Sequence, residues 1–416
     1  MFDSKTHLTS VQTMFGMRSL YESVCYCNRC GMCAGACPSY QQTLQEPFSA
    51  RGRNQALRKM FGSKLKGKAE QKLLKEMVLS CTLCGRCTQY CPGKIPTAQH
   101  VLEIRRRAGI NLLPATLFHL LRLRQTAPRW FFFLMKVVFL LRRMGIVQLI
   151  SYIPGFLWLK HALEILPSSP KISELKNPVI QNPTLIYLPS FEAEFLMPEL
   201  FEQTYELVCK KYVPLVWHNT SSGLFEYVYG DIRRARRLVR KLITQHARVG
   251  GGKLPLLTDS IDVYNFLKLT PQLFEGFPTL AQKAKHFADQ VCFVTDFFPK
   301  KIVQKQSFHL PVQLMPAALF SVETSPQLDM QKILHTLFDK NFVECGYKDG
   351  SVPPFGYGFV KHTHAPAYAL AAVQTVATHQ IQTVFVMSGL AALELAFYLR
   401  KFYPTARAVH VVQLNG

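Results

Sequence analysis

Residues 27–38 read CNRCGMCAGACP, and residues 81–92 read CTLCGRCTQYCP. In each stretch three cysteines follow one another at intervals of three residues, a fourth follows four residues later, and a proline comes next. Eight of the 12 cysteines in this chain of 416 residues lie in these two stretches. Such clustering argues for cofactor ligation in a reducing compartment and against a secreted disulfide framework.

This spacing is typical of 4Fe–4S ligation. A short loop around a cubic cluster presents three thiolates at that interval, while the cysteine before proline ligates the neighbouring cluster. The sequence therefore predicts two 4Fe–4S clusters, each completed by the last cysteine of the other motif. The first cluster is assigned Cys27, Cys30, Cys33 and Cys91, and the second Cys81, Cys84, Cys87 and Cys37. The alternative, a pair of zinc sites, fits poorly because structural zinc prefers two CxxC pairs that lie far apart in sequence.

The segment between the motifs combines helical periodicity with positive charge. Residues 51–75 contain nine Lys or Arg and one acid, Glu70. The simplest interpretation is a solvated face. A more specific hypothesis places Arg51 and Arg53 beside a cluster. Their positive charge would favour the reduced state of that cluster and raise its reduction potential. Apolar residues at helical spacing predict a mainly helical module over residues 1–110: Leu57, Met60, Phe61, Leu65, Leu73, Leu74, Met77 and Val78.

Residues 111–181 form a connector of different composition. From Asn111 to Lys160 there are seven Lys or Arg and no Asp or Glu, and this part includes WFFFLMKVVFLLRRMGIVQLI. No run of about eighteen apolar residues occurs, so a spanning helix is not expected. Basic, aromatic helices of this kind pack on the protein's own body, lie on an anionic membrane or dock on a partner, and the sequence leaves these alternatives open.

After residue 182 short apolar strands alternate with helices. TLIYLP, VPLVWH and LPLLTD predict buried strands, and the basic stretch after Gly230 predicts a helix with a solvated face. LPLLTDSIDVYNFLK followed by VCFVTDFFP is mirrored by TVFVMSGLAALELAFYLRK followed by AVHVVQL. Both predict strand, turn, helix and strand, so we expect two α/β units, residues 182–300 and 301–416. No catalytic set is recognisable in this half, which is expected to be structural.

The two motifs, with SARGRNQAL between them, resemble the iron–sulfur subunit of glycolate oxidase. They are equally similar to the lactate-utilisation, anaerobic glycerol-3-phosphate dehydrogenase and heterodisulfide-reductase-like subunits. This family joins a helical ferredoxin module to two CCG repeats. The resemblance implies an α+β multidomain fold: an N-terminal α-helical ferredoxin module followed by two α/β CCG-type repeats. In the family the clusters carry electrons from a flavin subunit towards quinone or another acceptor.

The C-terminal half departs from the CCG pattern. Residues 221–223 read SSG where the family has Cys-Cys-Gly, and TDSIDV around Ser260 replaces a Cys-rich turn. In the second repeat Cys345 and Gly346 remain of one motif, and MSGLAAL replaces the other. The resemblance therefore implies that the electron-transfer module is retained on a scaffold that lacks the thiolates for a further cluster.

The expected function is that of an iron–sulfur electron-transfer subunit with no substrate site of its own. Its partner would be a flavin dehydrogenase for glycolate, lactate, another 2-hydroxy acid or glycerol-3-phosphate, and its acceptor quinone or another carrier. FAD or FMN is expected on that partner, because this chain has no flavin or nicotinamide fingerprint. The net charge of +23 suits an acidic partner, or an anionic membrane or quinone site reached through residues 111–160.

The N-terminal MFDSKTHLTS shows no signal peptide, so a cytoplasmic location is expected, with peripheral attachment to the inner face of the membrane left open. The alternative function is a basic iron–sulfur binding or redox-sensing protein without a dehydrogenase partner. Nucleic acid is not an expected partner, because no recognition motif accompanies the basic stretches.

Overall fold

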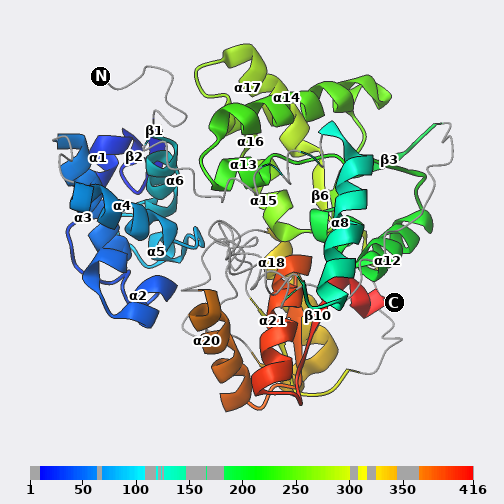
Figure 1. Cartoon of the computed structure of the whole chain (residues 1–416). Coiled ribbons are helices and arrows are strands. Elements are labelled where there is room, and N and C mark those ends of the chain that lie inside the picture. The colour runs from blue at the N-terminus through cyan, green and yellow to red at the C-terminus, as the bar shows by residue number, and fades with distance from the viewer. Residues whose placement is uncertain are drawn as a thin grey trace.

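The computed structural model describes residues 10–62, 68–107, 126–146, 182–299, 308–315, 325–343 and 365–415, together with residues 119, 123 and 165. It combines a helical N-terminal part with parallel sheets covered by helices (Figure 1), which confirms the mixed α+β class. Cys345, Gly346 and most of the connector lie outside the described residues.

The N-terminal module is a set of short helices preceded by a β-hairpin. In the hairpin β1 (Ser10–Thr13) pairs antiparallel with β2 (Gly16–Ser19), and the turn places Gly16 at φ +84°. The sequence analysis missed this hairpin. The helices are α1 (Leu20–Cys25), α2 (Pro38–Thr43), α3 (Ala50–Gly62), α4 (Lys68–Leu79), α5 (Arg86–Gln89) and α6 (Thr97–Arg107).

The apolar periodicity between the motifs is largely that of α3 and α4. Leu57, Leu74 and Val78 are buried, as predicted. Leu73 lies in α4, as the periodicity predicted, but its side chain is 44% exposed. The reason is geometric: each helical residue turns by about 100°, and Leu74 with Val78 already occupies the inner face. Leu65 and the side chain of Phe61 lie outside the described part of the chain.

Two four-stranded parallel sheets carry the C-terminal half. The first has the order β4 (Pro214–Val216), β3 (Leu185–Tyr187), β5 (Leu256–Thr258), β6 (Val291–Phe293). The second has the order β10 (Arg407–His410), β9 (Thr383–Val386), β7 (Val312–Leu314), β8 (Phe342–Val343). Numbered within its own unit, each sheet has the order second, first, third, fourth strand. This shared order agrees with the internal sequence repeat.

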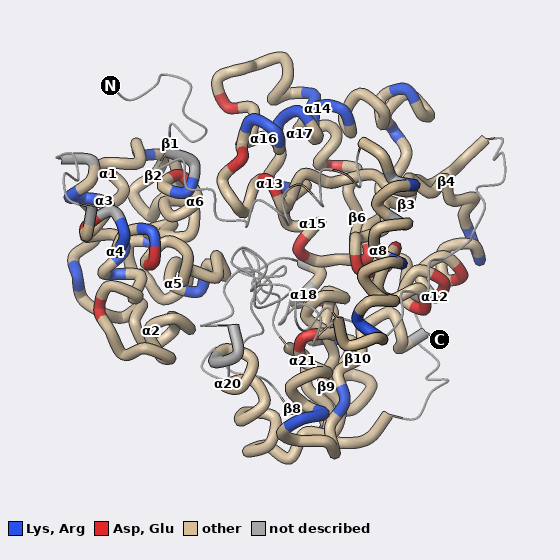
Figure 2. The backbone as a smooth tube through the Cα atoms, viewed as in Figure 1, with Lys and Arg blue, Asp and Glu red and all other residues tan. Residues whose placement is uncertain are grey.

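Helices connect and cover these strands. In the first unit they are α11 (Phe191–Phe195), α12 (Pro198–Cys209), α13 (Leu224–Val228), α14 (Ile232–Arg248), α15 (Ile261–Lys268), α16 (Thr270–Leu273) and α17 (Pro278–Asp289). In the second they are α18 (Ser325–Phe338), α20 (Ala365–Thr378) and α21 (Gly389–Phe402). The predicted basic helix is α14. It buries Val239 and Leu242 and exposes Arg237 and Arg240, so its charge forms a solvated face (Figure 2).

The connector is represented mainly by α8 (Pro128–Arg143). One face packs on the first unit: Phe131 and Phe139 are buried, and the Phe131 ring meets the edge of Phe195 at 5.5 Å between centroids. Trp130 and Phe133 are exposed on another face. Packing on the protein's own body and presenting an external surface therefore both occur on this helix. Within the described residues, no helix is long and apolar enough to cross a bilayer.

Arg105 of α6 joins the helical module to the first sheet unit. Its guanidinium donates to the carbonyl oxygens of Val78 (2.7 Å from Nη2), Cys81 (2.8 Å) and Val228 (2.9 Å). Val78 lies in the last turn of α4, Cys81 opens the second motif, and Val228 ends α13. Because charged donors make the stronger hydrogen bonds, this one side chain fixes the second motif against the C-terminal half.

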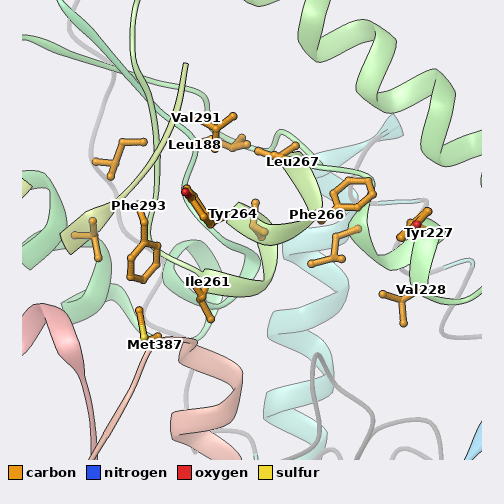
Figure 3. Packing of buried hydrophobic residues seen from close by; sticks show 14 of the residues in the cluster. Leu188, Tyr227, Val228, Ile261, Tyr264, Phe266, Leu267, Val291, Phe293 and Met387 are labelled. Atoms are coloured by element: carbon orange, nitrogen blue, oxygen red, sulfur yellow. The ribbon is translucent and has the colours of Figure 1, made fainter. Parts of the chain in front are cut away.

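The two sheet units meet along a buried polar seam at the carboxyl ends of their strands. The amide of Ile261 donates to the carbonyl of Met387 at 2.9 Å, and Figure 3 shows the two residues together. The side chain of Glu192, in α11, packs against Gly389, the first residue of α21. A Cβ atom at position 389 would collide with the Glu192 side chain. Glu192 is fully buried, and neither carboxylate oxygen has a hydrogen-bond partner among the described residues. The seam therefore holds a carboxyl group that is costly to ionise.

The titration of Glu192 yields a stability prediction. Burial, together with the neighbouring Asp259 and Asp262 carboxylates, raises the pKa of Glu192 to about 7. The folded protein binds this proton more tightly than the unfolded chain, so the stabilising effect is complete below the unfolded pKa and is lost as the pH rises through 7. Glu192→Gln should therefore raise the free energy of unfolding by about 2–3 kcal/mol at pH 8 relative to wild type, with little effect at pH 4.5.

The measurement is chemical denaturation at both pH values under anaerobic conditions. The matched control is Glu202→Gln on the exposed face of α12. It should leave the free energy of unfolding unchanged at both pH values. Wild type and Glu192→Gln with parallel stability curves across this range would contradict the assignment of a buried, proton-binding carboxyl.

Candidate metal centre

The two cysteine motifs fold as two copies of one loop. Arg29 and Leu83, at equivalent positions, both have φ +57°, and the following Gly31 and Gly85 have φ +83° and +76°. Left-handed backbone at a non-glycine residue costs about 1–3 kcal/mol, so surrounding structure must hold it in place. The backbone hydrogen bonds also repeat: Ala34 to Gly31 (2.8 Å) and Cys37 to Ala34 (3.1 Å), Thr88 to Gly85 (2.9 Å) and Cys91 to Thr88 (3.3 Å).

These loops enclose two thiol-lined cavities. One is lined by Cys27, Cys30, Cys33 and Cys91, the other by Cys37, Cys81 and Cys84, and Cys87 lines both. Each cavity thus collects three thiols of one motif and the last thiol of the other, as in the crossed sets predicted from spacing. Among the described residues, no three His, Cys, Asp or Glu side chains converge as one metal ion requires. The thiols surround larger spaces, whereas a zinc site needs all four ligands within about 2.3 Å of one point.

The thiols of the two motifs influence one another strongly. Burial raises the pKa of Cys33 to about 11, and the nearby Cys37 and Cys27 add to that increase. Burial likewise raises the pKa of Cys87, with Cys84 the largest contributor among the neighbouring thiols. Crowded, buried thiolates need positive charge from what they bind, and the iron of a 4Fe–4S cluster supplies it. The donor set therefore fits such a cluster.

A buried guanidinium lies beside the second cavity. Arg53 is 2% exposed, and its Nη1 lies 3.6 Å from the sulfur of Cys37. Its other nitrogens donate to Ser39 Oγ (2.7 Å), Ser80 Oγ (2.8 Å) and the carbonyl of Met77 (2.8 Å). No carboxylate pairs with it among the described residues. The pKa of Cys37 is lowered. Burial would raise it, but the charge of Arg53 and the hydrogen bond with the Ser39 hydroxyl outweigh that effect.

Arg51 is placed differently beside the first cavity, which it lines. Its guanidinium is partly exposed and binds Glu46 through two hydrogen bonds, Nε to Oε1 at 2.6 Å and Nη2 to Oε2 at 2.7 Å. The pair is nearly neutral, so Arg51 contributes little net charge there. At the second cavity Arg86 is also buried, and its charge opposes the increase that burial causes in the pKa of Cys84. Buried positive charge is therefore concentrated near the second cavity, whereas Arg29, which also lines the first cavity, is exposed to solvent.

A neutral histidine holds the helices behind the cavities. His100 of α6 is buried, with its Nε2 2.6 Å from Ser23 Oγ and its Nδ1 3.3 Å from Asn54 Oδ1. The Asn54 amide donates to Thr97 Oγ1 at 3.0 Å, and both residues line the first cavity. Burial lowers the pKa of His100 to about 3, so the ring stays neutral at physiological pH. It links α1, α3 and α6 without adding charge.

The C-terminal half contacts the backbone beside the second cysteine motif. Tyr368 of α20 is buried and donates to the carbonyl oxygen of Ser80, 288 residues away in the sequence and next to Cys81. Nothing in the sequence around Tyr368 indicates this contact. The sequence analysis also missed Arg86, although it lies inside the second motif. Neither residue carries a local pattern that separates it from an ordinary core tyrosine or surface arginine.

The positions where the resemblance predicts degenerate CCG motifs do not line these cavities. Ser260 and Ser388 precede α15 and α21 and are buried in the seam between the sheet units. Residues 221–223 lie between β4 and α13 and are part-buried at Ser221 and Ser222. The remaining described thiols, Cys25, Cys209 and Cys292, line neither cavity.

Comparison with known proteins agrees with this site. Residues 23–95 match a family of 4Fe-4S dicluster domains. The chain is 35% identical over 92 residues to lactate utilization protein B of Macrococcus caseolyticus, covering 21% of this chain and 17% of that protein. It is 34% identical over 103 residues to the Hdr-like menaquinol oxidoreductase iron-sulfur subunit of Archaeoglobus profundus, covering 20% of this chain and 18% of that protein. No solved structure matches significantly.

The chain thus spans less than a fifth of the length of these curated relatives. Within that span, the family model begins just before the first cysteine motif and ends just after the second. The recognition made from the motifs is confirmed over residues 23–95: this region matches the 4Fe-4S dicluster domains and is similar to lactate-utilisation and Hdr-like iron–sulfur proteins.

Proposed function

We propose that this protein is the iron–sulfur electron-transfer subunit of an oxidoreductase complex. The observation that carries the proposal is the pair of thiol-lined cavities formed by crossed sets of cysteines. When bound, each 4Fe–4S cluster takes up and gives back one electron, so two clusters hold the two electrons released when a reduced flavin loses its protons to solvent. The ligands would be Cys27, Cys30, Cys33 and Cys91 for the first cluster, and Cys81, Cys84, Cys87 and Cys37 for the second.

The electron donor in this proposal is a partner flavoprotein dehydrogenase that carries FAD or FMN. Its substrate class is a small 2-hydroxy acid of the glycolate or lactate type, or glycerol-3-phosphate. The name of the lactate utilization relative supports the former, and the name of the menaquinol oxidoreductase relative supports a quinone as acceptor. The chain's own contribution is to bind the two clusters, to shield them from solvent and to adjust their reduction potentials through nearby charges.

The charge distribution gives the transfer a direction. Arg53 has no carboxylate partner among the described residues and lies against Cys37, whereas Arg51 at the first cavity is neutralised by Glu46. A nearby positive charge stabilises the more negative, reduced state of a cluster. The second cluster is therefore expected to have the higher potential, and electrons are expected to pass from the first cluster to the second.

The first test is the metal content of the anaerobically purified protein. We expect about eight iron and eight sulfide per chain, with an EPR spectrum of two spin-coupled clusters after reduction with dithionite. Cys84→Ser, in the second set only, should lose up to about half of the iron. Zinc without sulfide would contradict electron transfer altogether, and about twelve iron per chain would contradict the two-cluster assignment.

The direction of transfer is tested by replacing each arginine in turn. Arg53→Met should lower the potential of the second cluster by about 50–100 mV, equivalent to about 1–2 kcal/mol for one electron. The double variant Glu46→Gln with Arg51→Met should shift the first cluster by less, because it removes the whole ion pair and leaves the net charge unchanged. The measurement is an EPR-monitored redox titration of both variants. Shifts of equal size, or a rise on loss of Arg53, would contradict the proposed direction.

We also propose that α8 contacts an anionic membrane surface. Arg129, Lys136 and Arg143 recur every seven residues and are all exposed, so they form one row along the helix. The exposed apolar side chains form a stripe beside that row: Trp130, Phe133, Leu134, Leu140 and Met144. An apolar stripe with interfacial aromatics and flanking cations is typical of a helix that lies in the plane of an anionic bilayer.

Vesicle co-sedimentation tests this contact. Wild type should bind vesicles that contain phosphatidylglycerol more tightly than neutral phosphatidylcholine vesicles, and Leu140→Glu should weaken that binding at least about tenfold. Arg237→Glu, which removes an exposed cation from α14, is the matched control and should bind nearly as wild type. If Arg237→Glu weakens binding as much as Leu140→Glu does, the overall charge of the protein causes vesicle binding, and α8 is not the contact.

A further inference from the structure

The β1–β2 hairpin lies directly against both ends of the first cavity. The Phe15 ring, at its turn, stacks on Tyr26 with 4.8 Å between centroids and also packs against Gly93. Tyr26 precedes Cys27, and Gly93 follows Cys91 by two residues. Phe15 therefore bridges the loops that supply the first and last thiols of this cavity.

The side chains around this contact are apolar and exposed. Six of them lie in the hairpin or next to cysteines that line the first cavity: Met14, Phe15, Met17, Tyr26, Met32 and Tyr90. Met14 is 68% exposed and Met32, between Cys30 and Cys33, 57%. Contiguous exposed apolar surface is typical of interaction sites, and flexible Met side chains adapt to a partner's shape. We call these six residues the hairpin patch.

The hairpin patch lies over the thiols that come nearest to solvent. Cys30, in the first set, is exposed, whereas Cys37 and Cys84, in the second set, are buried. An electron entering or leaving from a protein partner therefore has its shortest route through the first cavity. The second cavity is covered instead by Arg53 and by Tyr368 of α20.

The rim of the patch is positively charged. The Arg18 guanidinium lies over the Tyr26 ring, 5.9 Å from its centroid. Arg29 and Lys94 are both exposed, each within three residues of a thiol of the first set. The neighbouring acid Glu22 caps α1 through hydrogen bonds to Ser19. A partner that fits this surface has an apolar centre and an acidic rim.

We propose that the hairpin patch is the docking surface for the electron-donating flavoprotein, whose flavin would be surrounded by an acidic rim. This inference rests on the proposed function and identifies the surface through which electrons would enter the protein. The donor is favoured over the acceptor because the unpaired charge of Arg53 makes transfer from the first cavity to the second favourable. Entry is therefore expected at the first cavity, where the thiols reach the surface.

The test uses oxidised flavodoxin, a small acidic flavoprotein, as the probe for the anaerobic full-length protein. Its dissociation constant is measured by isothermal titration at low and high salt. Wild type should bind at low salt and weaken as salt screens the rim charges. Met17→Glu and Lys94→Glu should each weaken binding at least about tenfold, because each places negative charge against an acidic partner. Leu140→Glu on α8 and Arg237→Glu on α14 are controls of equal exposure and should bind nearly as wild type.

Iron content and the dithionite-reduced EPR spectrum are recorded on the same samples. Clusters that are intact in Met17→Glu, combined with weakened binding, support the docking surface independently of turnover. The proposal is overturned if wild type does not bind flavodoxin, if the hairpin variants bind as wild type does, or if the α8 variant weakens binding instead. Failure of the proposed function looks different: the wild-type protein would then lack iron and sulfide.

Discussion

Mutual repulsion between crowded, buried thiols is the constraint on which the N-terminal module depends. Eight cysteines from two loops line two cavities that share Cys87, and burial raises the pKa of the thiols most enclosed there. Such an arrangement is stable only when the bound group supplies positive charge and the backbone prevents the loops from spreading. The hydrogen bonds of Arg105 and the neutral network around His100 provide that backbone restraint.

The two cavities are alike in backbone but unlike in surroundings. The first lies near the surface, beside an ion-paired arginine and under an exposed apolar hairpin. The second is buried between the module and the C-terminal half, beside Arg53, which hydrogen-bonds only neutral groups and the Cys37 sulfur. Burial and uncompensated charge both alter a cluster's potential, so the asymmetric scaffold supports the proposed transfer from the first site to the second.

The C-terminal half is hydrogen-bonded to the N-terminal module near the second cavity, and it thereby contributes to that asymmetry. Tyr368 and Arg105 tie both sheet units to residues next to Cys81. Serines and carboxyls occupy the seam between the sheets, with Glu192 fully buried against α21. Burying a carboxyl without a partner lowers stability as the pH rises, so this seam holds the units together most tightly when Glu192 is protonated.

Sequence spacing alone predicted the two cysteine sets, because cluster ligation imposes fixed intervals along the chain. Periodicity likewise determined α3, α14 and the strand–helix–strand units, because burial of one face repeats with the pitch of the element. Only the tertiary structure decided that Arg53 has no carboxylate partner among the described residues while Arg51 is ion-paired with Glu46, that Tyr368 binds the backbone next to Cys81, and that the hairpin lies beside the first cavity. Those features depend on contacts between residues far apart in the chain, and such contacts leave no local pattern of period or composition to be read.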